Sequence, residues 1–276
     1  MDIKHKIRLV CLIYLCYLLN KQKIMFNIQN TKSKSMSCLA LLLMLVSSAT
    51  TVKAEKTIDS YHNFDYGLPT NRRDGGSRGN RDNCIADTQN RNLVALIPEQ
   101  TVGINASVSP KLFFYVPKVN KHKTLEFVLR NEQDELMYEA FLTTEGEGIM
   151  SVEVPVDIKS NLLETNQNYH WYLSMICNFQ QRSRDIVVEG WIRQEAIDIA
   201  TKQELSVAGS IEQAEVYHEQ GFWYDALSTL ATNYQSSADR PLIRAKWSEL
   251  LKSVGLEDLA AKPFIEGKII KAQLVK

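Results

Sequence analysis

The feature that most constrains the fold is an alternation of apolar and polar residues with a period of two, which runs from Asn92 to Ala196. Leu125, Phe127 and Leu129, for example, share one face of a strand while the residues between them share the other. Turn residues separate the alternating segments, and no helical period interrupts them. The pattern predicts an antiparallel β-sandwich. The predicted strands are 92–97, 111–116, 124–130, 135–143, 148–155, 168–178 and 185–195, with a further short one at 101–105.

Residues 168–178 are the most informative of these strands. Period two places five side chains on the face that we expect to be buried: Tyr169, Trp171, Leu173, Met175 and Cys177. A Trp and a Cys on one face favour an immunoglobulin-like sandwich. An immunoglobulin domain has a Tyr two residues before this Cys, where Met175 stands, so we expect a likeness of architecture alone. His170 faces the other way and is expected on the outer surface or against the helical segment.

Helical periodicity replaces the alternation after Asp198. Residues 214–230 resemble one tetratricopeptide unit at its small, aromatic and glycine positions, which are Ala214, Tyr217, Gly221, Trp223, Ala226 and Leu230. One unit is too few for a peptide-binding solenoid, which needs about three repeats. We therefore expect a small helical cap on the sandwich and an α+β fold class. The alternative is that this segment docks a peptide through Tyr217 and Trp223.

The first 54 residues have the features of an export segment. A nine-residue apolar stretch at 38–46 follows Lys32 and Lys34 and precedes small residues that end at Ala54. This stretch is too short to span a membrane, which takes about 20 residues, so we expect a cleaved signal peptide. A second apolar run at 9–19 suggests that translation starts at Met25 or Met36; the alternative is a membrane anchor.

Removal of this segment changes the charge balance. The whole chain carries 32 basic and 32 acidic residues. Residues 1–54 contain eight of the basic ones and one acidic one, which leaves 24 and 31 and a net charge of −7. An acidic exported chain binds polyanions poorly. We therefore expect no nucleic acid partner, and a membrane contact only through an uncleaved N-terminus.

Two cysteines remain after the export segment, Cys84 and Cys177. An even pair in an oxidising compartment favours one disulfide. The bridge would close a loop spanning 93 residues, which stabilises a fold by about 4 kcal/mol in chain-entropy models. The alternative is two unrelated buried thiols.

Residues 55–91 form an extended arm that is rich in Gly and Arg and shows neither strand nor helix periodicity. Arg72, Arg73, Arg78 and Arg81 are its candidate binding residues, because guanidinium groups hold carboxylates of a partner protein or an acidic glycan. The alternative is that these arginines pair with the protein's own surplus acids and fix the arm to the sandwich.

Catalytic and metal-binding motifs are weak throughout. Residues 75–79 match G-x-S-x-G, but the flanking residues predict neither the strand nor the helix that a nucleophile elbow requires. The histidines lack metal-ligand spacing, and no nucleotide-binding loop is present. Glu189 and Asp225 each adjoin a Trp or Tyr, but surface carboxylates explain them better than an acid–base pair. We expect no catalytic residue, no metal and no cofactor.

Several motifs in a fixed order carry a family resemblance. They are GLPTNRRDGGSR (67–78), Cys84, LVALIPE (93–99), FFYVP (113–117), HWYLSMIC (170–177), VEGWI (188–192), GFWYDAL (221–227) and SVGLEDLA (253–260). In these the chain resembles a family of exported cyanobacterial proteins catalogued as domain of unknown function 928. The resemblance covers nearly all of residues 64–264 and implies export, but no activity. The tail 265–276 lies outside it.

The sequence therefore predicts five parts: export segment 1–54, arm 55–91, sandwich 92–197, helical cap 198–264 and tail 265–276. We expect a non-enzymatic interaction or accessory protein, periplasmic or extracellular, that binds a protein of the cell envelope or a secreted one. Trp191 and Trp223 are its candidate aromatic contacts. The alternative is a glycan-binding or glycan-processing envelope protein, which requires paired carboxylates beside exposed aromatic rings.

Overall fold

A computed structural model describes residues 71–73, 93–99, 101–118, 123–156, 162–234 and 240–275. All of them belong to one unit, Thr57–Lys276. The proposed disulfide partner Cys84 and the arginines Arg78 and Arg81 lie outside the described residues. Within the described part of the chain, no helix is long and apolar enough to cross a membrane.

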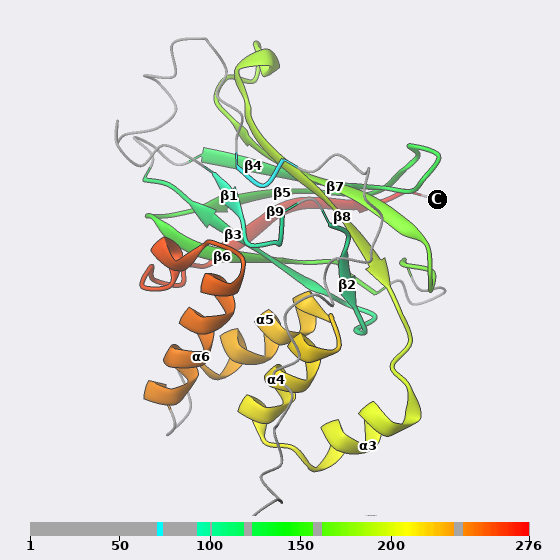
Figure 1. The fold of residues 1–276 in the computed structure, drawn as a ribbon. Helices are drawn as coiled ribbons and strands as arrows, with labels where there is room; N and C mark the ends of the chain where they lie inside the picture. The colour runs from blue at the N-terminus through cyan, green and yellow to red at the C-terminus, as the bar shows by residue number, and fades with distance from the viewer. Residues whose placement is uncertain are drawn as a thin grey trace, which may run out of the picture. The chain divides into compact units, whose positions relative to one another are not determined.

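Nine strands form two sheets in the described residues (Figure 1). The larger sheet has the order β2 (Gly103–Asn105), β8 (Ile186–Gln194), β7 (Asn168–Ile176), β4 (Lys123–Arg130), β5 (Leu136–Thr144) and β9 (Gly267–Leu274). The smaller sheet has the order β1 (Val94–Ala95), β3 (Lys111–Val116) and β6 (Gly148–Glu153). All pairs of neighbouring strands are antiparallel except β2 and β8, which are parallel.

The helices follow the strands in sequence, apart from a 3-10 turn, η2 (Arg182–Arg184), at the tip of the β7–β8 hairpin. They are α3 (Ile199–Val207), α4 (Ser210–Glu219), α5 (Trp223–Asn233), α6 (Arg240–Ser253) and the 3-10 turn η3 (Glu257–Leu259). The side chain of Asp198 caps α3 by accepting from Thr201 N–H at 2.9 Å. Gly221 has φ of +87° between α4 and α5, a conformation that a residue with a Cβ rarely adopts.

The smaller sheet lies between the larger sheet and the helices (Figure 1). Neighbouring residues of β3 show this directly, since they point to opposite sides. Phe114 packs edge-on against Trp171 of β7 at 5.4 Å between ring centroids. Phe113 packs edge-on against Trp247 of α6 at 6.2 Å. Both Phe side chains are buried, so the apolar run FFYV is a middle-layer strand with two covered faces.

Two aromatic residues at the start of α5 lock the helices to the sheets. The indole N–H of Trp223 donates to the carbonyl of Leu96 at 2.8 Å. The hydroxyl of Tyr224 accepts from Nε1 of Trp171 at 3.2 Å and donates to the carbonyl of Trp191 at 3.3 Å. Gly103 makes room for the Tyr224 ring, because a Cβ at that position would lie 2.3 Å from Cε2. Helices and sheets consequently share one continuous apolar core.

The structure confirms the α+β class and most strand bounds, and β3 has the predicted bounds 111–116. Tyr169, Trp171, Leu173 and Met175 are buried on one face, as expected. The finer assignments, an immunoglobulin-like sandwich and a tetratricopeptide-like segment, are not confirmed. The sheet order includes a parallel pair, and α4 with α5 forms one helical hairpin.

The tail is a correction to the sequence prediction. We expected no element in 265–276, but Gly267–Leu274 pairs with β5 as strand β9. The tail escaped detection because its residues are exposed on both faces, and a strand without a buried face has no reason to alternate. The strand at 92–97 is also shorter than expected, since β1 covers Val94–Ala95.

Removal of the Tyr224 hydroxyl tests how strongly α5 is locked. Tyr224→Phe leaves the Trp171 indole N–H and the Trp191 carbonyl without this partner in a buried site. We expect the free energy of unfolding, measured by urea denaturation, to fall by about 1–3 kcal/mol. The control Tyr234→Phe, at the half-buried end of the same helix, should change it by less than about 0.5 kcal/mol. Equal effects would contradict the lock.

Candidate interaction surfaces

Arg72 is a buried structural residue. Its side chain is 7% exposed. Nη1 donates to the carbonyls of Ile97 at 3.2 Å and Val254 at 2.6 Å, while Nη2 pairs with Glu99 at 2.5 Å. Burial lowers the pKa of Arg72, and the Glu99 carboxylate opposes that shift. One guanidinium thereby ties the arm to the segment after β1 and to the end of α6.

The prediction that Arg72 binds a partner is therefore wrong, and the alternative, an arm fixed to its own protein, describes this residue. Its neighbours act in the same way: backbone bridges join Asn71 to Glu189 of β8 and Arg73 to Val94 of β1. Arg73 also lies 3.6 Å from Asp258. For Arg78 and Arg81, which lie outside the described residues, the partner-binding prediction stays open.

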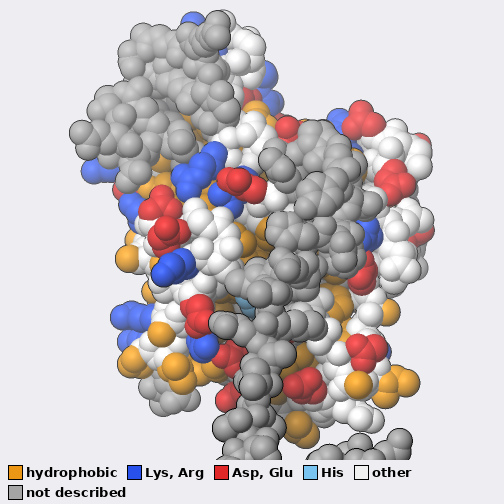
Figure 2. All heavy atoms as spheres, viewed as in Figure 1, with side chains coloured by type: hydrophobic (Ala, Val, Ile, Leu, Met, Phe, Trp, Pro, Cys, Tyr) orange, Lys and Arg blue, Asp and Glu red, His pale blue; other side chains and the backbone are white. Residues whose placement is uncertain are grey.

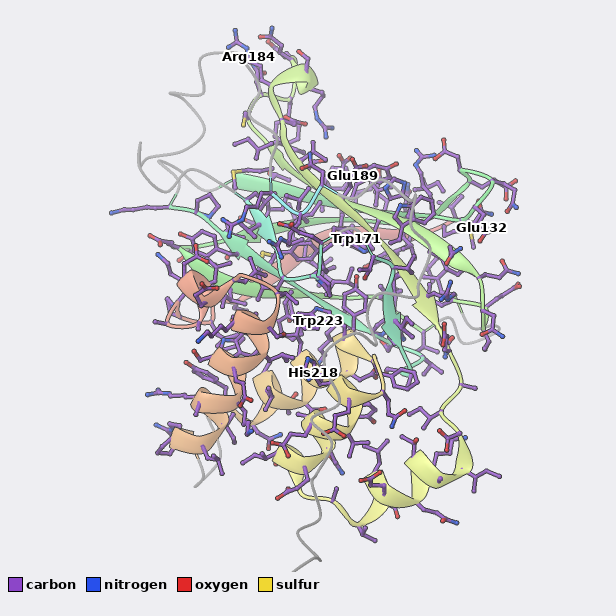
Figure 3. The ribbon with its side chains drawn as sticks, in the orientation of Figure 1. Glu132, Trp171, Arg184, Glu189, His218 and Trp223 are labelled. Carbon is purple, nitrogen blue, oxygen red and sulfur yellow. The ribbon has the colours of Figure 1, made fainter. Side chains whose placement is uncertain are left out.

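Trp223 is wrong as an aromatic contact for a partner. It is 0% exposed and its indole N–H is bonded inside the core. Figure 3 shows Trp223 and Trp171 in the interior, between the helices and the larger sheet. The signal was ambiguous because a Trp beside a Gly in a helical hairpin suits either role. Trp191 differs, since it is half-buried on the outer face of β8.

Four side chains cluster on this outer face. The Trp191 ring stacks on His170 at 4.3 Å with an interplanar angle of 12°. The Tyr172 hydroxyl lies 2.8 Å from Nδ1 of His170. A carboxylate oxygen of Glu189 lies 3.1 Å from Nε2, without hydrogen-bonding geometry. Burial lowers the pKa of His170 to about 4, opposed by the charge of Asp134, and burial also raises the pKa of Glu189. The imidazole is therefore neutral at physiological pH.

Asp225 and Glu189 have separate surroundings and do not form an acid–base pair. The Asp225 carboxylate accepts from the backbone N–H groups of Ala106 at 2.7 Å and Ser107 at 3.1 Å. Burial raises the pKa of Asp225 to about 6, against the two N–H groups that favour its charged form. This carboxylate thus holds the loop after β2 on α5. Among the described residues no three His, Cys, Asp or Glu side chains gather in the manner of a metal site.

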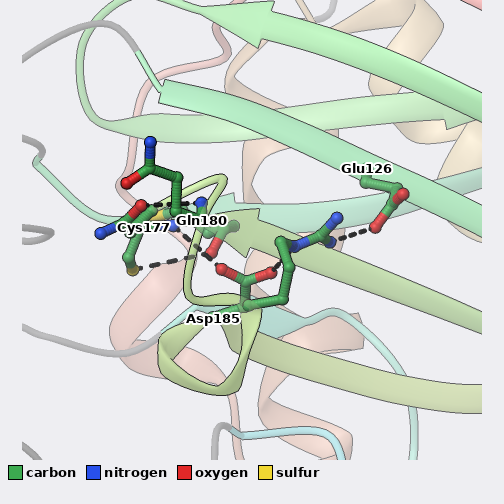
Figure 4. Close-up of polar contacts among 7 residues, drawn as sticks. Glu126, Cys177, Gln180 and Asp185 are labelled. Carbon is green, nitrogen blue, oxygen red and sulfur yellow. Dashed lines mark hydrogen bonds and ion pairs between the residues drawn. The ribbon is translucent and has the colours of Figure 1, made fainter.

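A charged network closes the β7–β8 hairpin (Figure 4). Arg182 pairs with both Glu126 and Asp185. Asp185 also accepts from the backbone N–H of Cys177 at 3.1 Å. Cys177 is half-buried against the core at this end of β7. Its pairing with Cys84 stays a prediction. Figure 3 places Arg184 at the tip of this hairpin, away from the other labelled residues.

Strand β9 presents apolar side chains to solvent. Ile269 is 51% exposed, Ile270 59% and Leu274 41%. The register with β5 pairs Ile269 with Leu142 and Leu274 with Tyr138, which places both on the side of the buried core. Lys268 and Lys271, opposite Thr143 and Phe141, are on the other side. Among the described residues, β5 is the strand that pairs with β9, so its second edge is open to a further strand.

A groove of about 840 Å³ lies beside α6. Its lining is Tyr234, Arg240, Arg244, Ser248 and Ala260 to Phe264. Figure 2 shows that acidic, basic and hydrophobic side chains otherwise intersperse over the described part of one face. The groove is instead basic and aromatic. Sequence reasoning missed it, because its residues come from two segments that the fold brings together.

The comparisons with known proteins identify a family without an assigned activity. A family model described as Domain of Unknown Function (DUF928) matches residues 73–264. The chain belongs to the DUF928 family. No curated protein and no solved structure matches it. The DUF928 match includes the groove residues and ends before β9.

Substitution of Arg72 separates its structural role from a binding role. Arg72→Ala leaves two buried carbonyls and Glu99 without their cation, and we expect a loss of about 2–4 kcal/mol in the free energy of unfolding. Arg73→Ala, which removes a half-exposed ion pair, should cost less than about 1 kcal/mol. Chemical denaturation monitored by circular dichroism measures both. An Arg72→Ala variant as stable as Arg73→Ala would show that Arg72 is not a structural clamp.

His170 makes a pH-dependent contribution to stability. Its pKa is about 4 in the folded chain and about 6.5 unfolded. Stability is therefore fully present above about pH 6.5 and is lost as the pH falls toward 4, because the unfolded state binds the proton first. His170→Gln should gain about 1–3 kcal/mol relative to wild type between pH 7 and pH 4. Between pH 7 and 8 the difference should be constant; a difference that is also constant below pH 6 would contradict the burial effect.

Proposed function

We propose that this DUF928 chain is an exported, non-enzymatic interaction protein of the cell envelope or of a secretion system, and that it holds an extended segment of a partner protein along β9. The observation that carries the proposal is the open edge of β9 with its exposed Ile269, Ile270 and Leu274. A strand added there satisfies the free backbone groups of β9 and covers apolar surface, as in β-strand addition. Export rests on the N-terminal sequence.

Charge defines the partner segment. Lys268 and Lys271 lie on one side of β9, while Ile269 and Leu274 lie on the other. A complementary strand carries Asp or Glu opposite the lysines and apolar residues opposite the isoleucine and leucine, because opposite charges across a strand pair attract. Lysines and the register shift between Phe141 and Leu142 disfavour pairing of β9 with identical edges. The pattern therefore favours an acidic, alternating segment of another protein.

The glycan alternative loses one of its supports. It required exposed tryptophans beside paired carboxylates, whereas Trp171 and Trp223 are buried and Glu189 and Asp225 have separate surroundings. A disulfide between Cys84 and Cys177 remains part of the proposal for an exported protein, and it stabilises the arm rather than the binding edge.

The test is capture of the tagged full chain from envelope and medium fractions of its host, followed by titration of synthetic segments of any recovered partner. Lys268→Glu/Lys271→Glu on β9 should weaken binding at least about tenfold through charge repulsion. The matched control Lys202→Glu/Lys252→Glu reverses two exposed lysines on α3 and α6 and should bind like wild type. Equal binding by both variants, or recovery of no partner, would refute the proposal.

A further inference from the structure

We propose that the groove beside α6 binds an acidic oligosaccharide, with uronic acid carboxylates held by Arg240 and Arg244 and a sugar ring resting on Tyr234 and Phe264. This site is distinct from β9 and lies within the family match. It does not depend on the proposed protein partner.

Two arginines supply the positive charge of the groove. Arg240 and Arg244 are four residues apart on α6, so they lie on one face of the helix about 6 Å apart along its axis. Both are exposed and line the groove. By contrast, the third cation, Lys262, is neutralised by Glu147 at 2.5 Å. The two arginines are therefore the groove's carboxylate-binding groups.

Helix stability does not explain these arginines. The first turn of α6 contains no acidic residue. Cations at the N-terminus of a helix oppose the helix dipole and cost about 0.3–1 kcal/mol each. Two such residues beside a groove of about 840 Å³ consequently point to an anion that the groove receives.

Aromatic rings form the floor beside the arginines. The Arg244 guanidinium lies 5.3 Å from the centroid of the Tyr234 ring, within cation–π range. Phe264 packs against Tyr234 at 4.9 Å and against the buried Trp247 at 5.2 Å. Tyr234 and Phe264 are themselves half-buried, so each leaves part of its ring to the groove. This contact fixes Arg244 above an apolar surface.

The combination selects the class of ligand. A guanidinium fork binds a carboxylate through two parallel hydrogen bonds. A uronic acid carries that carboxylate on a ring whose C–H face packs on an aromatic side chain, and the ring hydroxyls find partners in Ser248 and the backbone of 260–263. An acidic side chain of a peptide presents the carboxylate without an apolar ring face, so it fills half of the site.

Titration of the full chain with tri-galacturonic acid by isothermal calorimetry tests the site. Binding should weaken at least about tenfold in Arg244→Ala and in Arg240→Ala, because each loses a charge-assisted hydrogen bond. Arg244→Lys keeps the charge, loses the fork and should bind with intermediate affinity. The matched control Arg184→Ala, an exposed arginine at the β7–β8 tip, should bind like wild type. Thermal melts of each variant show that it is folded.

Two further ligands complete the test. The methyl ester of the same trisaccharide lacks the charge and should bind at least about tenfold more weakly, and added salt should weaken binding of the acid. A glutamate hexapeptide should bind more weakly than the trisaccharide. The proposal is overturned if the trisaccharide does not bind at millimolar concentration, if the ester or Arg244→Ala binds as tightly, or if the hexapeptide binds better.

Discussion

The hydroxyl of Tyr224 is the contact on which the arrangement of the molecule depends. It accepts from Trp171 in the larger sheet and donates to the carbonyl of Trp191 one strand away. It is fully buried, so each of these groups would otherwise lack a partner away from water. The absence of a side chain at Gly103 lets the ring reach this position. Helix α5 therefore sits in one register on the sheets, and α4 and α6 are placed by packing against it.

This lock consumes residue types that usually advertise function. Trp171, Trp223 and Arg72 are all committed to holding layers together. What remains for binding lies where the layers end. The smaller sheet has three strands and the larger has six, so the apolar side of β9 extends past its cover. The groove likewise forms where the chain leaves α6 and turns toward β9. Both surfaces follow from the mismatch between layers.

Electrostatics separates these two surfaces from the rest of the chain. Outside the export segment the chain has a net charge of −7, yet both surfaces carry lysines or arginines beside apolar side chains. A cation next to apolar surface attracts an anion that also has an apolar part. An acidic strand and an acidic sugar meet this description in different shapes, one extended along a backbone edge and the other lying flat in a groove.

The sequence alone determined the α+β class, most strand bounds and the buried face of 169–175, because a period of two is a local property of a strand that covers a core. Tertiary structure decided the rest. Arg72 and Trp223 belong to residue types that serve a core or a binding site equally well, so their burial depended on Glu99, Val254 and Leu96, which are distant in sequence. Strand β9 has no buried face to betray it, and the parallel pairing of β2 with β8 is a non-local contact. Layer contacts, which no local pattern encodes, fixed which residues were left for function.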